Sequence, residues 1–186
     1  MHAEVQTPLR LSAIERMSQA ISRAELSLAA ALVAVIFGVL LANVASRGLG
    51  QPLVWTDELA VHLMVWIAFL GASLGIASRG HMAIGILPER LNERGRKRLV
   101  AGIDGLVLGF TLMFGLLVWN WLDPPGLIAA GSGAALAERS FNFVYLDPTL
   151  TLGIRKIWFW LILPITCVTA TVHAVARLAQ SLGALR

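Results

Sequence analysis

The sequence predicts an all-α membrane protein with four transmembrane helices, and three observations support this fold class. Hydrophobic residues make up 57% of the 186 residues, and the mean hydropathy is +0.74, both above the values of an ordinary soluble domain. The apolar residues fall into four blocks, each near the roughly 20 residues that a helix needs to cross a hydrocarbon layer. Charged residues lie largely between those blocks. We therefore expect a single membrane domain over residues 1–186.

The predicted transmembrane helices cover about residues 26–46, 58–78, 99–122 and 157–177. A further helix at about residues 9–23 is amphipathic, because its apolar residues recur at helical spacing opposite charged ones. We expect this N-terminal helix to lie at the membrane interface, where Ser12 and Glu15 match a capping box. The first apolar block is too long, and follows too many charged residues, for a cleavable signal.

The segment 123–156 is predicted to be a long outer loop. Asp123-Pro124-Pro125-Gly126 should stop the third helix, and the small, apolar stretch after it is too short to span a membrane. We expect a partly helical hairpin on the outer surface, with aromatic residues at the interface (Phe141, Phe143, Tyr145). The sequence indicates no internal repeat and no broken transmembrane helix.

The distribution of Lys and Arg predicts the orientation of the chain. Eleven of the fifteen lie in the N-terminal arm, the second connection and the C-terminal tail, and four lie on the other side. Because cytoplasmic segments carry the excess of positive charge, we predict that both termini are cytoplasmic. The basic residues are thus explained by topology, and nucleic acid is not an expected partner. Five tryptophans then fall at outer helix ends, as in an aromatic belt (Trp55, Trp119, Trp121, Trp158, Trp160).

Polar residues bracket the second apolar block at both ends. Asn43 and Arg47 lie one helical turn apart at the outer end of the first helix, so they can face the same groove. Asp57 and Glu58 begin the second helix, where carboxylates can cap free N–H groups, with Thr56 as a competing cap. Glu58 has a further candidate role, pairing with Arg47 or with an arginine of a neighbouring chain. Within membrane depth such groups should be paired.

Other candidate sites receive structural interpretations. Asp104, near the inner end of the third helix, is either a structural residue or a functional one that binds a coupling ion or relays a proton. His62 and His173 would occupy opposite leaflets, so they cannot share a haem iron, and Cys167 is the only cysteine. We expect no cofactor, no metal site and no catalytic residues. The basic run that begins at Arg94 predicts contact with anionic lipid, and a specific partner is the alternative.

The polar bracket carries a resemblance to a known family. Asn43 and Arg47, Trp55 with Asp57-Glu58-Leu59, Trp66 through Phe69-Leu70-Gly71, and Arg79-Gly80-His81 resemble the small membrane subunit of TRAP (tripartite ATP-independent periplasmic) transporters. Gly71 and Gly75 add a small-xxx-small pair that lets helices pack closely. The candidate interface or structural polar cluster therefore comprises ten residues: Asn43, Arg47, Trp55, Asp57, Glu58, Trp66, Gly71, Gly75, Arg79 and His81.

The resemblance implies a role in the bacterial inner membrane. A large TRAP membrane subunit would move an organic acid with sodium, and a periplasmic substrate-binding protein would deliver that acid. This chain would be a non-enzymatic scaffold, since it has no acidic group near the membrane midplane from which to build a sodium site. Two alternatives remain open: a self-sufficient four-helix transporter acting as an oligomer, and a membrane anchor subunit of a redox complex.

Overall fold

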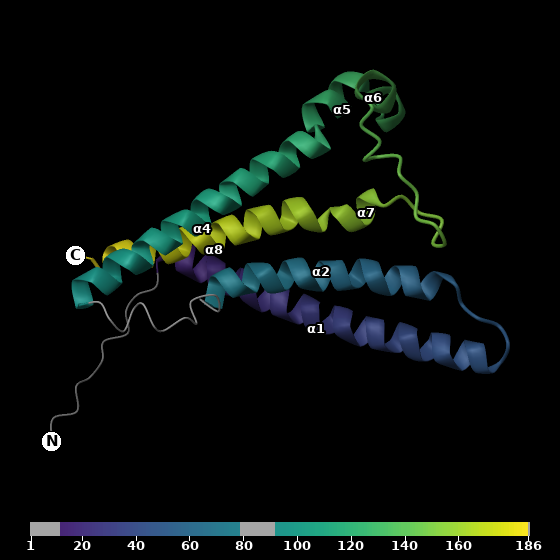
Figure 1. The fold of residues 1–186 in the computed structure, drawn as a ribbon, viewed down its shortest axis with the longest axis horizontal. Helices are drawn as coiled ribbons and strands as arrows, with labels where there is room; N and C mark the ends of the chain where they lie inside the picture. Colours follow the sequence, from purple (N-terminus) through teal and green to yellow (C-terminus); the bar gives the residue numbers. More distant parts are fainter. Residues whose placement is uncertain (1–11, 79–91, 186) are drawn as a thin grey trace.

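The computed structural model describes residues 12–78 and 92–185, and it is almost entirely helical (Figure 1). Four helical segments are long and apolar enough to cross a membrane, as the sequence predicts. Helix α1 is Ala13–Gly48, α2 is Trp55–Ser78, and α4 is Glu93–Leu122. The fourth segment joins α7 (Ile157–Trp160) to α8 (Ile162–Gly183). Within the described ranges, β-structure amounts to one isolated bridge between Pro148 and Arg155.

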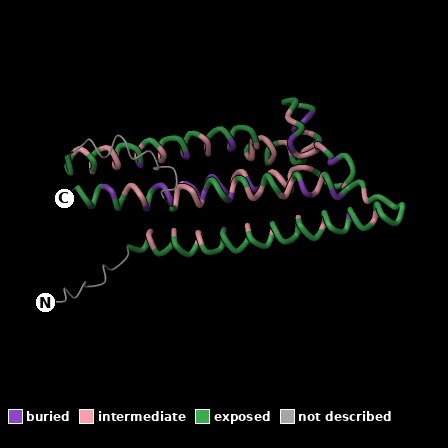
Figure 2. The backbone as a smooth tube through the Cα atoms, turned by 60° about the horizontal axis from the view of Figure 1, so that its bottom comes forward, coloured by how far each residue is buried: buried purple, intermediate pink, exposed green. Residues whose placement is uncertain are grey.

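Helix α8 is the centre of the bundle. It packs against α4 on one side and against the α1–α2 hairpin on the other (Figure 1). Eight residues of α8 are buried, whereas the much longer α1 buries only Glu25 and Asn43. Figure 2 shows this contrast as a line of buried positions along the central helix, with α1 largely exposed. The start of α1 and the end of α8 lie at the same end of the bundle (Figure 1).

Helix α1 begins at the predicted capping box. The Ser12 side chain accepts from the backbone N–H of Glu15, and the Glu15 carboxylate accepts from the backbone N–H of Ser12 at 2.6 Å. We expected a separate helix before the first span, but α1 continues without a break from Ala13 to Gly48. No glycine or proline stands between Arg23 and the first span, so nothing in the sequence ends the helix there. Residues 9–11 of the expected helix lie outside the described residues.

Helix α4 begins earlier than predicted, at Glu93 rather than near residue 99. The side chain of Asn92 caps it by accepting from the backbone N–H of Gly95 at 2.8 Å. Glu93 then lies one turn from Lys97, with Glu93 Oε1 3.3 Å from Lys97 Nζ. The basic run is therefore part of the helix and not of the loop before it.

The outer segment is partly helical, as predicted, with α5 at Pro124–Ala130 and α6 at Gly133–Ser140. Asp123 adopts a left-handed conformation (φ 43°) that ends α4, and its side chain caps α5 through the N–H of Gly126. Tyr145 turns inward, and its hydroxyl donates to the carbonyl of Leu122 at 2.6 Å. Burial, and then the charge of Asp123, raise the pKa of Tyr145, so this hydroxyl stays a donor. Gly133 allows the close approach, since a Cβ there would lie 2.8 Å from Tyr145 Cβ.

The fourth apolar segment is one spanning stretch, Ile157–Gly183, in which the single residue Leu161 separates two helices. Helix α7 ends at Trp160 and α8 starts at Ile162. Pro164 stands four residues after Trp160 and has no N–H with which to close a helical hydrogen bond to that carbonyl. This junction lies near the end of the segment that the sequence predicts to be outer, next to the α2 residues described below.

Candidate functional site

Asn43, Arg47 and Asp57 join the end of α1 to the start of α2, and we call them the outer polar cluster after the predicted orientation. Asn43 Nδ2 donates to Asp57 Oδ1 at 3.0 Å, and Arg47 Nε donates to Asn43 Oδ1 at 3.3 Å. Arg47 Nη2 completes the ring at 3.2 Å from Asp57 Oδ2. Asn43 is buried, whereas the side chains of Arg47 and Asp57 are 60% and 58% exposed. The cluster thus has a fixed inner amide and an accessible ion pair.

Glu58 does not contact Arg47 in this structure, contrary to the pairing considered from the sequence. Its carboxylate instead accepts from three successive backbone N–H groups, those of Leu150, Thr151 and Leu152, at 2.6 to 3.2 Å. The Thr151 hydroxyl adds a fourth hydrogen bond at 2.6 Å. Arg47 pairs with Asp57 and not with Glu58, because consecutive side chains on a helix point about 100° apart. Glu58 therefore fastens the outer loop to α2.

Glu58 belongs to a stripe of α2 that contacts the outer end of the fourth segment. His62, one turn further, stacks its ring on that of Phe159, with centroids 4.1 Å apart and planes 5° apart. Trp66, another turn along, donates from Nε1 to the carbonyl of Phe159 at 2.8 Å. Residues four apart share a helix face, so one stripe of α2 positions both the loop and α7.

A second polar cluster lies at the other end of the bundle, and sequence reasoning missed it. We call Ser18, Glu25 and His173 the inner cluster. Glu25 Oε2 is 3.2 Å from His173 Nε2, and Ser18 Oγ is 2.7 Å from His173 Nδ1. His173 is fully buried and Glu25 is 5% exposed. The signal in the sequence was an acid at the edge of one apolar block and a histidine inside another, but 148 residues separate them.

Further polar contacts continue along the interface of α2 with α8. Ser73, fully buried, lies 3.0 Å from Thr169 through the two hydroxyl oxygens. Arg177 Nη2 donates to the carbonyl of Ala77 at the end of α2. Asp104 is one of three buried residues that lie seven apart on one face of α4, with Thr111 and Val118.

The remaining predicted site residues are dispersed. Trp55 is 40% exposed at the start of α2. Gly71 faces open space, since a Cβ there would meet nothing within 4 Å, so it does not serve close packing inside this chain. Gly75 lies on α2 at an intermediate exposure. Arg79 and His81 lie outside the described residues.

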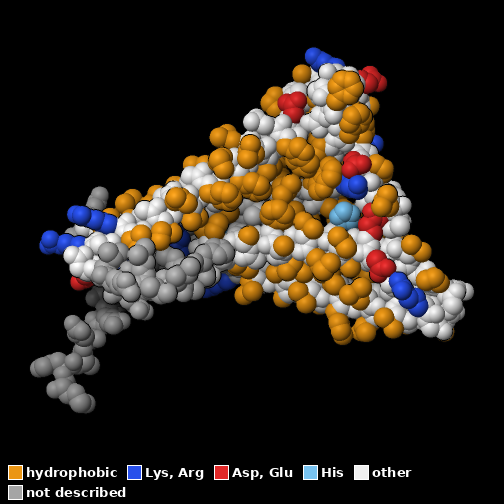
Figure 3. Space-filling view, viewed as in Figure 1, with side chains coloured by type: hydrophobic (Ala, Val, Ile, Leu, Met, Phe, Trp, Pro, Cys, Tyr) orange, Lys and Arg blue, Asp and Glu red, His pale blue; other side chains and the backbone are white. Residues whose placement is uncertain are grey.

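The geometry defines a class of protein. Both polar clusters bind helices to one another, while Figure 3 shows hydrophobic side chains covering the middle of the visible face and charged ones gathered toward its ends. Exposed apolar side chains on all four long helices agree with a lipid-embedded surface. The fold is that of a multi-pass membrane protein, and its described polar clusters hold its own helices together.

Comparison with known proteins identifies the family. The model for "Tripartite ATP-independent periplasmic transporters, DctQ component" matches residues 36–184, which is more than half of the chain. The chain therefore belongs to the DctQ family, the small permease component of TRAP transporters. This confirms the resemblance found in the sequence and supports a multi-pass protein of the inner membrane.

Three curated relatives agree with this family. The sialic acid TRAP transporter permease protein SiaT of Haemophilus influenzae is 36% identical over 78 residues, 41% of this chain and 13% of that protein. The C4-dicarboxylate TRAP transporter small permease protein DctQ of Pseudomonas aeruginosa is 30% identical over 87 residues, 46% of this chain and 40% of the relative. The sialic acid TRAP transporter small permease protein SiaQ of Vibrio cholerae is 25% identical over 135 residues, which are 72% of this chain and 67% of the relative. The matches thus span less than half of the first two relatives.

Proposed function

We propose that this chain is the fixed scaffold of a TRAP transporter in the bacterial inner membrane, with both termini in the cytoplasm. A large membrane subunit beside it carries an organic acid together with sodium. A periplasmic substrate-binding protein delivers that acid. The substrate class is supported by the names of the relatives, since sialic acid and C4-dicarboxylates are both carboxylic acids.

The composition of the α1 surface carries the scaffold proposal. This helix of 36 residues buries only Glu25 and Asn43, which are both polar. Its large apolar side chains point outward at helical spacing, among them Val33, Phe37 and Val44, which are 54%, 65% and 69% exposed. A helix with polar contacts inside and an apolar face outside presents that face to lipid or to another membrane protein.

The outer polar cluster lies at the end of this apolar face, where Arg47 and Asp57 stay accessible. We propose that the large subunit packs along α1 and contacts this ion pair. The match to SiaT supports a joint role, because the matched 78 residues are only 13% of a protein that is itself named a permease. The DctQ-like part and the rest of that permease thus share one chain.

Neither alternative raised by the sequence gains support from the structure. A redox anchor needs histidines free to bind haem iron, but of the two histidines that the structure describes, His62 stacks on Phe159 and His173 is bound to Ser18 and Glu25. A self-sufficient transporter remains testable by uptake.

Uptake by membrane vesicles tests the proposed function. Three kinds of vesicle are compared: one without this chain, one without the large subunit, and one with both. Each receives the periplasmic binding protein, an inward sodium gradient, and either sialic acid or a C4-dicarboxylate. We expect uptake only when both membrane subunits are present. Sodium-driven uptake by vesicles that hold this chain without the large subunit would contradict the scaffold role and favour a self-sufficient transporter.

A further inference from the structure

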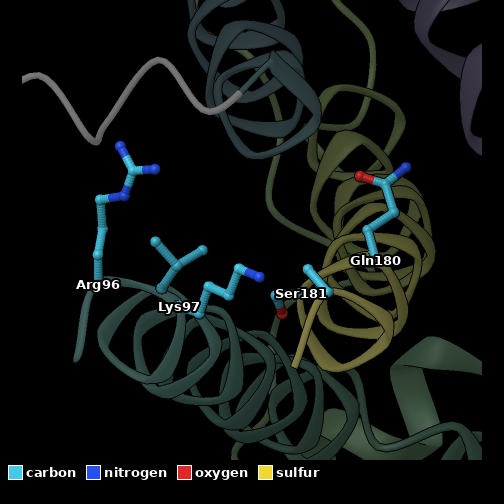
Figure 4. Close-up of a pocket in the computed structure, with 6 residues that line it drawn as sticks. Arg96, Lys97, Gln180 and Ser181 are labelled. Atoms are coloured by element: carbon cyan, nitrogen blue, oxygen red, sulfur yellow. The ribbon is translucent and has the colours of Figure 1, made fainter. Parts of the chain in front are cut away.

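A pocket between the beginning of α4 and the end of α8 belongs to neither polar cluster. Its volume is about 280 Å³, and its lining combines basic, polar and apolar residues: Arg96, Lys97, Val100, Gln180, Ser181 and Ala184. Figure 4 shows Arg96 and Lys97 extending from α4 into the open space, which Gln180 and Ser181 border from α8. The pocket lies at the end of the bundle that the charge distribution predicts to be cytoplasmic.

The charge of this pocket suits an anion. Arg96 and Lys97 bring two positive charges, and a guanidinium can donate two parallel hydrogen bonds to a phosphate. Lys97 also pairs with Glu93 at 3.3 Å, but the two side chains are 41% and 74% exposed. Exposed pairs of this kind contribute little, so Lys97 can turn to a stronger anionic partner.

An apolar strip begins at the same pocket and distinguishes an amphiphile from a free anion. Arg96, Val100, Ile103, Val107 and Phe110 follow one another at steps of four and three residues, so they share one face of α4. Ile103 is 37% exposed and Phe110 is 57% exposed. A ligand with its phosphate beside Arg96 can therefore lay an acyl chain along this face toward the middle of the membrane.

We propose that this pocket is a specific binding site for an anionic glycerophospholipid. The phosphate diester sits between Arg96 and Lys97, and one acyl chain follows Val100, Ile103, Val107 and Phe110. Basic pockets between membrane helices on the cytoplasmic side have the chemistry that binds such headgroups. The site goes beyond diffuse attraction of a basic surface to the leaflet, because it combines a shaped cavity with a chain path.

Native mass spectrometry of the full-length chain in detergent micelles tests the site. The chain is titrated with phosphatidylglycerol, with diacylglycerol of the same chain length, and with inorganic phosphate. We expect saturable binding of phosphatidylglycerol, and much weaker binding of the other two. Diacylglycerol binding equally well would leave only an apolar groove, and inorganic phosphate displacing the lipid at similar concentration would make the pocket a free-anion site.

A matched pair of variants locates the binding. Arg96→Gln with Lys97→Gln removes the two pocket charges, and Arg94→Gln with Arg98→Gln removes the same charge from two residues of α4 that do not line the pocket. At about 1 kcal/mol for each of the two basic residues near the lipid, we expect the pocket variant to bind phosphatidylglycerol about thirtyfold more weakly than the control variant. Equal losses in the two variants would overturn the proposal. If the pocket variant is not monodisperse, Arg96→Gln alone is compared with Arg94→Gln alone on the same criterion.

Discussion

Glu58 shows how one side chain can organise a whole loop. Its carboxylate accepts four hydrogen bonds from residues 150–152, which lie more than 90 positions away in the chain. Three successive N–H groups that converge on one anion form a tight site, and hydrogen bonds to a charged acceptor are stronger than neutral ones. A single residue of α2 therefore fastens residues 150–152 of the loop after α6.

Replacing Glu58 by glutamine should loosen this loop. Glu58→Gln keeps the shape but removes the charge and turns one acceptor into a donor, so we expect a loss in the free energy of unfolding. Thermal unfolding in detergent, followed by circular dichroism, measures the loss. Glu138→Gln is the control, since Glu138 is exposed on α6 in the same outer region. Equal midpoints for the two variants would show that the carboxylate does not fasten the loop.

Replacing Arg47, in contrast to Glu58, should affect binding of the large subunit more than the stability of the chain. Its ion pair with Asp57 is exposed, so Arg47→Ala should change the stability of the isolated chain by less than about 1 kcal/mol. The same substitution should reduce the amount of large subunit that co-purifies with the tagged chain, and should leave the choice of substrate unchanged. Arg139→Ala removes an exposed arginine from the outer α6 and serves as control. A changed substrate profile in Arg47→Ala would contradict the interface role.

Among the elements, α8 carries most of the packing and the inner cluster. The contact of Glu25 with His173 joins α1 to α8 in a buried setting, where a lone ionisable group is costly. Ser18 adds a second contact from α1 to the same histidine, so the N-terminal part of α1 is held by polar contacts rather than by apolar burial.

A double-mutant cycle measures this contact. Glu25→Leu and His173→Phe should each destabilise the chain by roughly 2 kcal/mol, because each leaves a buried polar partner behind. The double variant should lose less than the sum of the two, since it removes both groups at once. Unfolding free energies in detergent provide the comparison. Strictly additive losses would mean that the two residues stabilise the chain independently.

The sequence predicted the elements better than their contacts. Apolar length revealed four spanning segments, and local caps at Ser12 and Asp123 marked where helices begin or end. The start of α4 was missed because a run of arginine and lysine was interpreted as loop, although Asn92 caps a helix there. The separate N-terminal helix was expected from a change in polarity, but polarity alone does not end a helix.

Contacts between distant helices could not be derived in the same way. The partner of His173 depends on the rotation and depth of α1 against α8, and a single sequence carries no signal for either. For Glu58, the sequence suggested Arg47 as a nearby partner of opposite charge. In the structure, its partners are backbone N–H groups, which every residue except proline has, so residue types could not reveal them. For Asn43, Arg47 and Asp57, the sequence predicted only that polar groups at this depth should be paired, and the structure shows which atoms bond.

At the scale of the whole molecule, we propose that another membrane protein covers the apolar surface of α1. Cysteine cross-linking can locate the covered face, because Cys167 is the only native cysteine and Cys167→Ser removes it. In that background we expect Phe37→Cys on α1 to form cross-links to the large subunit in native membranes. Leu117→Cys is the control, since it is 58% exposed on α4, away from α1. Cross-links from Leu117→Cys alone would place the partner against α4.

The most direct test of the scaffold role is the stoichiometry of the tagged chain purified from its native membrane in mild detergent. Mass photometry or native mass spectrometry reports which chains accompany it and in what ratio. We expect one copy of this chain with one copy of the large membrane subunit. Recovery of this chain only as a stable monomer or homo-oligomer, from membranes that also contain the large subunit, would contradict it.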